Sequence, residues 1–421
     1  MHRLLLSLLA GALALGTLGC EKEAPEDEDR SFPLPEGQAP RPDEGGPTYS
    51  GGAVTWHHDV GPIVQRRCQG CHGEGGVAPF ALMTYAQAAA RHAEVAGSVT
   101  SLRMPPWMPT GEQRFKDSRR LTRGEVDVIA AWSAQGAPEG DPATAPAPQP
   151  APQELAWVDV KMAPPQAYTP NAAQQDDYHC FLLEPGFTEA RDVIGFEVLP
   201  GARHQVHHVL LYNVPEAAAR EADAKQAGPG WTCFGDSGIG GAEVLGAWAP
   251  GSPATRYPEG TGIRVQPGSV VVMQVHYNLG NGPRVADRTA VDLQFSRAPV
   301  PQVATLELMA SAGFAIPPDS QGYQFTFQQL LVGGTLWGVL PHMHTLGRRI
   351  VLQRESGTLI DIPAWDFHWQ QAYFYEEPVQ LPPSVGRLQL TCIWDNPTQR
   401  TVRWGEGTED EMCLAYLYLT R

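Results

Sequence analysis

The sequence predicts a mainly β chain, in which two β-sandwich domains in tandem follow a small helical unit. From about residue 155 onwards, short alternating runs such as DVIGFEVL and SVVVMQVHYNL are separated by turn residues, which is typical of β-sandwiches. The 44 glycines and 39 prolines, with few long helical periodicities, favour the same class. A chain of 421 residues is too long for one ordinary core, so we expect more than one domain.

Residues 1–20 have the features of an export signal. A basic start at Arg3 precedes an apolar run, Leu4–Leu18, that is too short to span a membrane. The closing TLGC resembles a bacterial lipobox, in which Cys20 becomes the lipidated first residue. The alternative is ordinary secretory cleavage, which leaves Cys20 as a spare thiol. We expect an exported chain, lipid-anchored to a bacterial membrane in the periplasm or at the cell surface, where disulfides are permitted.

Two linkers divide the rest of the chain. Residues 21–52 are acidic, rich in proline and glycine, and aperiodic, which predicts a disordered tether. Residues 141–160 form a second linker, stiffened by proline. Between them, residues 53–140 carry helical signals and are expected to form a small all-α unit. The formal net charge of −16 argues against nucleic acid as a partner, because phosphate binding needs a basic face.

The helical unit carries the motif CQGCH at residues 68–72, which is the C-x-x-C-H signature of covalent c-type haem attachment. Cys68 and Cys71 suit thioether bonds to the two haem vinyl groups, and His72 suits the iron. A redox dithiol would normally follow a strand in a thioredoxin-like unit, and a zinc half-site would need a second cysteine pair nearby. Neither context is present, so the motif predicts one covalently bound haem c.

The surroundings of this motif resemble a small class I-like cytochrome c domain. The stretch HHDVGPIVQRRC predicts the helix that leads into the haem site. Residues 121–138 predict a closing amphipathic helix, whose capping box pairs Thr122 with Glu125. A Met/His pair of axial ligands raises the haem potential and suits electron transfer.

Two Met-Pro pairs compete for the distal position on the iron. We favour Met104 over Met108 as the ligand. Three histidines are alternative ligands that are more often surface or helix residues, namely His57, His58 and His92.

The β-rich half carries five histidines and one methionine that are candidate copper ligands. They are His207, His208, His276, His342, His344 and Met412. Imidazole with thioether favours copper, especially Cu(I), over zinc, calcium or magnesium. Neighbouring strand residues point to opposite faces, so His207 and His208 share a metal only if the strand is bulged or twisted and one ring uses Nδ1 and the other Nε2. The plain alternative for this pair is one core and one surface histidine.

In order along the chain, the motifs YHC, HHVLLY, QVHYN, HMHTLGRRI, DFHWQQ and DEMC resemble those of the copper type II, ascorbate-dependent monooxygenases. The resemblance covers about residues 165–421 and implies two jelly-roll domains, 161–300 and 301–421, with one copper each. It implies an all-histidine electron-transfer copper and a second copper that binds O₂. The first would be held by His207, His208 and His276, and the second by His342, His344 and Met412, with Tyr416 at the catalytic site.

Cysteine usage fits this resemblance. Four of the seven cysteines remain once Cys20, Cys68 and Cys71 are assigned, and an even remainder in an exported protein suggests two disulfides. The resemblance implies the pairs Cys180–Cys233 and Cys392–Cys413.

One departure concerns the substrate. Members of the family that amidate peptides grip a terminal carboxylate with an arginine, an asparagine and a tyrosine. Here those positions hold Leu340, Leu414 and Tyr416, so we expect a neutral or apolar substrate instead of a glycine-extended peptide.

The function that these features predict is a copper-dependent monooxygenase that hydroxylates a C–H bond with O₂. Its cofactors would be two copper ions and one haem c, and its upstream donor ascorbate or a periplasmic redox carrier. The linker would raise the effective concentration of the haem unit near the coppers. The alternatives are a non-enzymatic copper-binding or electron-relay protein, and a haem enzyme with a β-sandwich partner.

Overall fold

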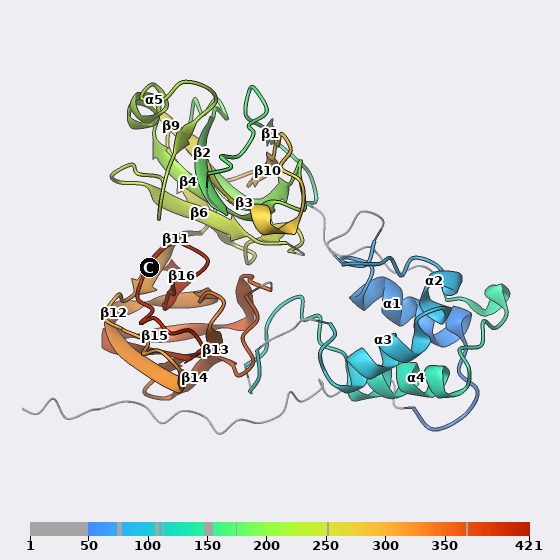
Figure 1. Cartoon of the computed structure of the whole chain (residues 1–421). Coiled ribbons are helices and arrows are strands. Elements are labelled where there is room, and N and C mark those ends of the chain that lie inside the picture. Colours follow the sequence, from blue (N-terminus) through green and yellow to red (C-terminus); the bar gives the residue numbers. More distant parts are fainter. Residues whose placement is uncertain are drawn as a thin grey trace, which may run out of the picture. The chain divides into compact units, whose positions relative to one another are not determined.

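The computed structural model describes most of the chain beyond the N-terminal tether (Figure 1). The described residues are 49–73, 78–105, 109–111, 113–146, 155–173, 175–250, 252–367 and 369–421. Cys20 and Met108 lie outside them, so the predicted lipidation and the second Met-Pro pair have no structural counterpart here. The predicted mainly β class is confirmed, with strands dominating after residue 155.

The helical module, residues 49–146, is built from short helices. They are η1 (Trp56–Val60), α1 (Gly61–Arg67), α2 (Tyr85–Ala89), α3 (His92–Thr100), α4 (Arg123–Ala134) and η2 (Pro142–Thr144). The predicted capping box is present at the start of α4, where Thr122 and Glu125 satisfy each other's backbone N–H groups. The rings of Trp56 and Trp132 lie 5.8 Å apart and join η1 to α4 in one apolar core.

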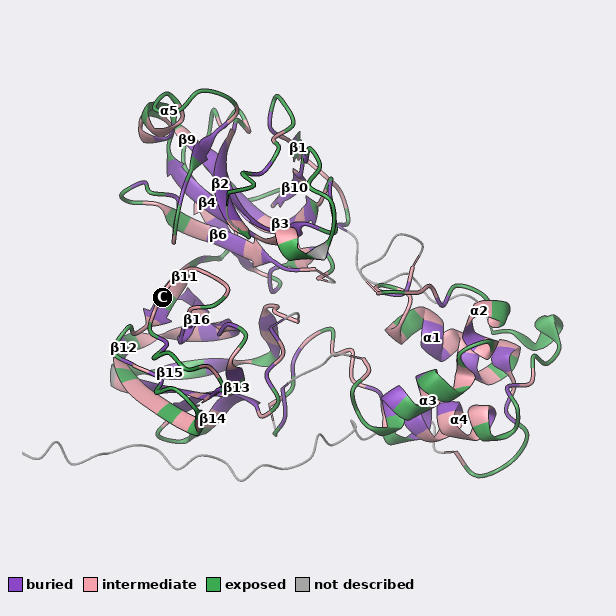
Figure 2. Ribbon diagram, viewed as in Figure 1, coloured by how far each residue is buried: buried purple, intermediate pink, exposed green. Residues whose placement is uncertain are grey.

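The first β-sandwich packs two sheets over a shared core. A five-stranded sheet has the order β5-β2-β9-β4-β6, and it faces strands β1, β10, β3 and β8, with β7 on β3. The elements are β1 (Val160–Met162), β2 (Asp176–Leu183), β3 (Arg191–Leu199), β4 (Val206–Pro215), α5 (Glu216–Asp223), β5 (Trp231–Thr232), β6 (Glu243–Trp248), β7 (Thr255–Arg256), β8 (Thr261–Val265), β9 (Ser269–Asn278), η3 (Leu279–Asn281) and β10 (Ala290–Phe295). Figure 2 shows β2, β4 and β9, which are neighbours in the five-stranded sheet, coloured mostly as buried.

The second β-sandwich depends on two long strands. Its elements are β11 (Gln302–Ala310), β12 (Ser320–His342), β13 (Gly347–Arg354), β14 (Gly357–Ile362), β15 (Tyr373–Asn396) and β16 (Leu414–Thr420). The ladder between β12 and β15 is interrupted between Val332 and Gly334 and again between Leu336 and Gly338. Gly334 has φ +111° and its Cβ would lie 2.5 Å from the carbonyl of Thr420, so only glycine fits this bend.

A short parallel ladder joins the two sandwiches. Residues Gln302 and Val303 of β11 pair with Thr261 and Gly262 of β8, so one hydrogen-bonded sheet runs from β1 to β14. Sequence reasoning expected two separate domains in tandem and did not anticipate this connection, because the pairing joins strands about 40 residues apart with no motif to mark it.

Part of the helical module packs on the second sandwich. Thr110 forms an antiparallel bridge with Asp361, and Phe115 forms one with Tyr375. Phe115 is 4 % exposed and its ring lies 5.1 Å from that of Tyr375, inside the core of the second sandwich. The sequence predicted residues 53–140 as a self-contained unit. In the structure, Phe115 of this unit packs in the apolar core of the second sandwich instead.

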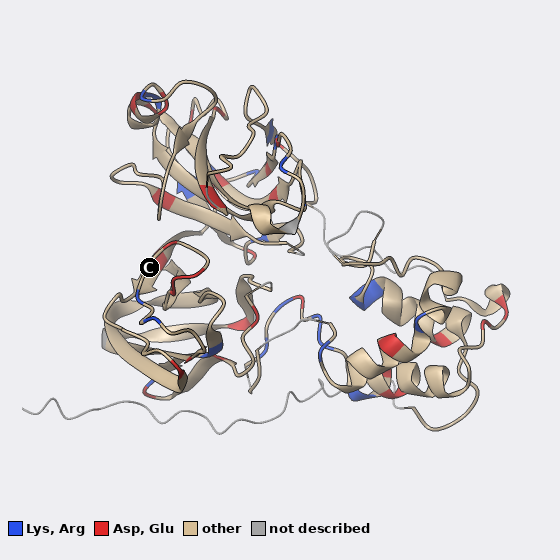
Figure 3. Cartoon of the chain, in the orientation of Figure 1, with Lys and Arg blue, Asp and Glu red and all other residues tan. Residues whose placement is uncertain are grey.

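Charged residues are sparse on the strands. Figure 3 shows the ribbons of the sheets mostly in the colour of uncharged residues, with Asp, Glu, Lys and Arg scattered along loops and edges. Within the part of the chain that the structure describes, no helix combines the length and the apolar character needed to cross a membrane.

The docking of Phe115 predicts a stability effect in the second sandwich. Replacing Phe115 by Ala should lower the free energy of unfolding of that sandwich by about 3 kcal/mol, because it leaves a cavity in a close-packed core. The measurement is a thermal melt of the full chain. Leu330→Ala, at a β12 position that is 61 % exposed, is the control and should leave the melting temperature nearly unchanged. Equal melting temperatures for both variants would show that the segment is not docked in solution.

Candidate metal centre

His207, His208 and His276 form one cluster, in which a nitrogen of each ring lies within 4.8 Å of the others. His208 of β4 faces His276 of β9, and the register shifts between Val206 and His208, which is a β-bulge. The bulge turns both neighbouring rings toward one point. The nitrogens differ from the expected Nδ1 and Nε2 pair, because Nδ1 of His208 lies 3.3 Å from Nδ1 of His207 and 3.2 Å from Nδ1 of His276.

Asp176 sets the protonation of His276. Its Oδ1 lies 2.9 Å from Nε2 of His276, so the Nε2–H donates to the carboxylate and Nδ1 keeps a lone pair toward the cluster. Burial alone would raise the pKa of Asp176, but hydrogen bonds from His276 and Thr408 lower it to about 2. The ring of Tyr178 stacks on His276 with centroids 4.2 Å apart. The imidazole is therefore held at its edge and at its face.

A second set of candidate ligands lies at the end of β12. The rings of His342 and His344 have centroids 5.0 Å apart. Nδ1–H of His342 donates to the side-chain carbonyl of Gln370, and Nδ1–H of His344 donates to the backbone carbonyl of Asp410 at 3.1 Å. Both rings thus keep a lone pair on Nε2. Met412 is buried and lines the same cavity as these two rings.

Burial keeps these imidazoles neutral. It lowers the pKa of His208 well below its usual range, with neighbouring histidines adding to the effect, and it lowers the pKa of His276 despite the opposing effect of Asp176. It lowers the pKa of His342 to about 4 and that of His344 to about 3. Neutral imidazoles with inward lone pairs are the form that binds a transition metal.

Glu411 anchors the second set and was not assigned a role by the sequence. Its buried carboxylate accepts hydrogen bonds from the backbone N–H of His344 at 2.9 Å, the backbone N–H of Leu346 at 2.7 Å and the Trp394 indole at 2.8 Å. Burial raises its pKa to about 7, although these hydrogen bonds act in the opposite direction. One side chain therefore fixes the H-x-H turn beside Met412.

His208 of the first set and His342, His344 and Met412 of the second set border a single cavity of about 330 Å³, which we name cavity B. The rings of His208 and His342 lie 6.4 Å apart there, across the two sandwiches. Most of the remaining wall is apolar and includes Trp248, Leu340 and Leu414, and Tyr416 also lines it.

The charged groups of cavity B are all acidic. Among the described residues that line it there is no Lys or Arg, whereas Asp236 and Glu406 are present. Burial raises the pKa of Glu406 to about 7, and the neighbouring carboxylates of Asp236 and Asp410 add to this. An anionic ligand would be repelled here.

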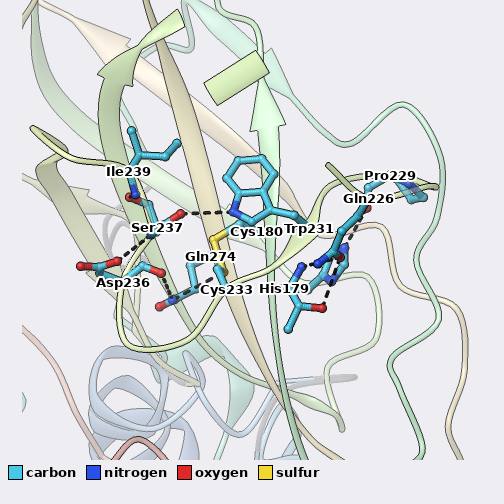
Figure 4. The surroundings of a disulfide bond; sticks show 12 residues. His179, Cys180, Gln226, Pro229, Trp231, Cys233, Asp236, Ser237, Ile239 and Gln274 are labelled. Carbon is cyan, nitrogen blue, oxygen red and sulfur yellow. Dashed lines mark hydrogen bonds between the residues drawn. A yellow bond between two sulfur atoms is a disulfide. The ribbon is translucent and has the colours of Figure 1, made fainter. Parts of the chain in front are cut away.

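The first disulfide, Cys180–Cys233, supports the wall of cavity B (Figure 4). Gln274, two residues before a candidate ligand on β9, donates to the backbone carbonyl of Asp236 at 2.9 Å and lies 3.7 Å from the sulfur of Cys233. The disulfide loop is thereby tied to the ligand-bearing strand.

The second disulfide, Cys392–Cys413, joins β15 to the residue that follows Met412. Both pairings are those implied by the family resemblance, so that prediction is confirmed.

A second cavity of about 540 Å³, which we name cavity A, borders the C-x-x-C-H loop. Cys68, Cys71, His72 and Met104 all line it. Nδ1–H of His72 donates to the backbone carbonyl of Phe80 at 2.9 Å, which leaves the Nε2 lone pair available. The volume is within the roughly 300–1,000 Å³ of cofactor pockets. These donors and this space fit a covalent haem with a sulfur and an imidazole as axial ligands.

The alternatives to haem fit cavity A less well. Desolvation raises the pKa of Cys68 to about 12, whereas a redox dithiol needs a lowered pKa. The described residues contain no zinc-like grouping of these cysteines with other His, Cys, Asp or Glu side chains. The structure places none of His57, His58 and His92 on the wall of this cavity.

Three arginines lie on the wall of cavity A, namely Arg67, Arg119 and Arg203. Guanidinium groups at a cofactor cavity suit carboxylates such as haem propionates.

Sequence reasoning found the candidate ligands but not the residues that orient them. Asp176 is the first residue of β2, Glu411 directly precedes Met412, and Phe367 and Gln370 lie inside the motif DFHWQQ. The hydrogen-bond partners of Asp176 and Glu411 are distant in the sequence. The only sequence signal for these two residues was an acid without an assigned role near a buried strand.

Two family models match this β-rich half. Residues 160–282 match the N-terminal domain of the copper type II ascorbate-dependent monooxygenases, and residues 302–420 match the C-terminal domain. The two-sandwich fold and its histidine sets are those of a copper-dependent monooxygenase, an oxidoreductase. The chain belongs to the copper type II ascorbate-dependent monooxygenase family.

Several characterised proteins are similar to this chain over the same region. Rat (Rattus norvegicus) peptidylglycine alpha-amidating monooxygenase is 29 % identical over 259 residues, covering 58 % of this chain and 25 % of that protein. Tyramine beta-hydroxylase of Caenorhabditis briggsae is 26 % identical over 268 residues, covering 57 % and 42 %. DBH-like monooxygenase protein 1 of Gallus gallus is 26 % identical over 272 residues, covering 57 % and 44 %. The chain thus spans a quarter to less than half of these relatives.

Asp176 should control metal affinity without being a ligand. Asp176→Ala removes the acceptor of the His276 Nε2–H, so copper affinity should fall by about 10- to 100-fold. The measurement is a chelator competition titration of the full chain. The control is Asp177→Ala, because Asp177 accepts hydrogen bonds from Tyr168 and Asn171 instead. Equal copper affinity in the two variants would contradict the assigned role.

Proposed function

We propose that this chain hydroxylates a C–H bond of a neutral or apolar substrate with O₂, and that its electrons arrive through a haem c in the helical module. The observation that carries the proposal is cavity B, where His208 of the first set meets His342, His344 and Met412 of the second around one mostly apolar space. The family supports copper, O₂ and ascorbate as the coarse chemistry.

The two sets of candidate ligands offer different donor atoms to a metal. His207, His208 and His276 offer three imidazoles and no weaker ligand. His342 and His344 are joined instead by a thioether from Met412, which favours Cu(I) and leaves coordination positions open. Copper at the two sets would supply one-electron transfer at the first and O₂ activation at the second.

The wall of cavity B supports the substrate class. Leu340 and Leu414 stand where the amidating relatives carry the polar groups of a carboxylate clamp, and the charged groups present are acidic. The apolar side chains would also exclude water from the reacting centre. The alternative function, a non-enzymatic electron relay, has no use for an apolar cavity beside a second histidine set that includes a thioether.

The helical module supports the haem donor. Cys68 and Cys71 would form the thioether bonds, and His72 and Met104 would be the axial ligands on cavity A. A haem c held there would supply a one-electron carrier of raised potential. Ascorbate or a periplasmic redox carrier would be the upstream donor.

Export and lipid anchoring through Cys20 belong to the same proposal. Two disulfides beside the ligand sets fit an oxidising compartment, in which such bonds persist.

Replacing Met412 by Leu tests the copper assignment. The swap nearly conserves volume and removes only the sulfur, so the fold should survive while O₂-dependent turnover is lost. Copper and iron per chain are measured beside O₂ uptake, and the unaltered chain should hold two coppers and one iron. The control is Met273→Leu, because Met273 is buried in the core of the first sandwich, away from both cavities. Full O₂ uptake in Met412→Leu would reject the assignment.

The charge of the substrate provides a second test. Uncharged amides or esters should be turned over, whereas the matching free acylglycines should not, since cavity B offers two carboxylates and no cation. Steady-state O₂ uptake with each matched pair is the measurement. Preferential turnover of the free acids would exclude the proposed substrate class.

A further inference from the structure

We propose that Phe367 and His207 form the electron-entry wall of the first histidine set, and that the helical module docks on this wall. The inference rests on the haem donor of the proposed function. The sequence suggested a tethered helical module that meets the coppers by diffusion. The inference is instead that the module stays in fixed contact with the sandwiches, which the sequence did not reveal.

Cavity A lies between the helical module and this wall. Cys71, His72 and Met104 border one side of it, while His207 and Phe367 border the other. A planar cofactor bound to the two thiols would therefore have the imidazole of His207 on the opposite wall of its own cavity.

Phe367 contacts both histidine sets. Its ring stacks on His207 with centroids 4.6 Å apart and an interplanar angle of 27°. The same ring meets His344 nearly edge-on, with centroids 5.7 Å apart. Phe367 is 8 % exposed, so it is a packed element of the site. It lies at the junction of cavity A and the two sets.

Gln370 holds this junction in place. Its side-chain NH₂ donates to the backbone carbonyl of Phe367 at 2.8 Å, and its side-chain carbonyl accepts from His342. Gln370 lines both cavities. The segment that carries the Phe367 ring is therefore fixed to the second histidine set.

The helical module is held against the sandwich by direct bonds. Arg119 donates to the side chain of Gln371, which is adjacent to Gln370. Backbone bonds also run from Thr110 to Asp361 at 2.8 Å and from Lys116 to Phe374 at 2.7 Å. Because Arg119 and Gln370 both line cavity A, the Arg119–Gln371 contact joins its two walls, and the module is held to the sandwich by more than the proline-rich linker.

The transfer across this wall balances as a single-electron step. One Fe(II) of a haem held by Cys68, Cys71 and His72 would become Fe(III), and one Cu(II) held by the first histidine set would become Cu(I). No bond forms or breaks and no proton moves. A one-electron reductant such as ascorbate restores Fe(II).

The test uses the full chain with haem and copper bound. A photoreduced flavin injects one electron into the oxidised protein, and decay of the ferrous haem absorbance gives the rate of transfer to copper. Phe367→Leu should slow this decay by about tenfold, because a small loss of alignment is costly for a positioned pair. Phe367→Tyr keeps the ring and should retain the rate. Phe325→Leu, at a partly buried phenylalanine of β12 that lines neither cavity, is the matched control.

Metal content and the haem reduction potential are measured for every variant. These two measurements distinguish a slower electron transfer from a loss of folded, metal-loaded protein. If Phe367→Leu loses metal, Phe115→Ser is used instead, because Phe115 lines neither cavity and its loss should undock the module, and slower decay is again expected. An unchanged rate in these variants overturns the entry wall and leaves the haem donor standing. A haem that never reduces copper in the unaltered chain, while ascorbate still supports turnover, overturns the donor as well and leaves the copper monooxygenase intact.

Discussion

The site depends on where the imidazoles of its five candidate histidine ligands place their protons. Each ring that binds a metal must present a lone pair inward, so the proton on its other nitrogen needs an acceptor in a desolvated interior. For His276 the acceptor is Asp176, which also accepts a hydrogen bond from the hydroxyl of Thr408 at 2.8 Å. Thr408 lies in the loop that precedes Met412. One carboxylate therefore orients a ligand of the first sandwich and ties it to the loop that carries a ligand of the second.

The same loop is stabilised from its other end. Glu411 binds the backbone around the H-x-H turn, and Cys413 is joined by a disulfide to Cys392 of β15. Met412 lies between these two anchors, so its position follows from the core of the second sandwich. A thioether ligand binds weakly, and pre-positioning it in this way offsets that weakness.

The sequence predicted the family and both disulfides, but not the contacts that surround the candidate ligands. Ligands such as His276 lie in short ordered motifs, and the two disulfides followed from the same resemblance. Asp176 and Phe115 could not be found in this way, because each acts through a partner more than 90 residues distant in the chain. The close approach of the Nδ1 atoms of His207 and His208 was not anticipated either, because a bulge fixes the direction of a side chain more finely than an alternating pattern can show.

Because of the bulge in β4, the adjacent residues His207 and His208 border different cavities. His207 lines cavity A and His208 lines cavity B, while their Nδ1 atoms lie 3.3 Å apart. On a regular strand the two rings would face opposite sides of the sheet and could not share a metal. With the bulge they meet at one point, and each still borders a separate space. Under the proposed function, the arrangement would separate the side from which electrons arrive from the side on which the substrate reacts, and the single bulge in β4 is enough to produce it.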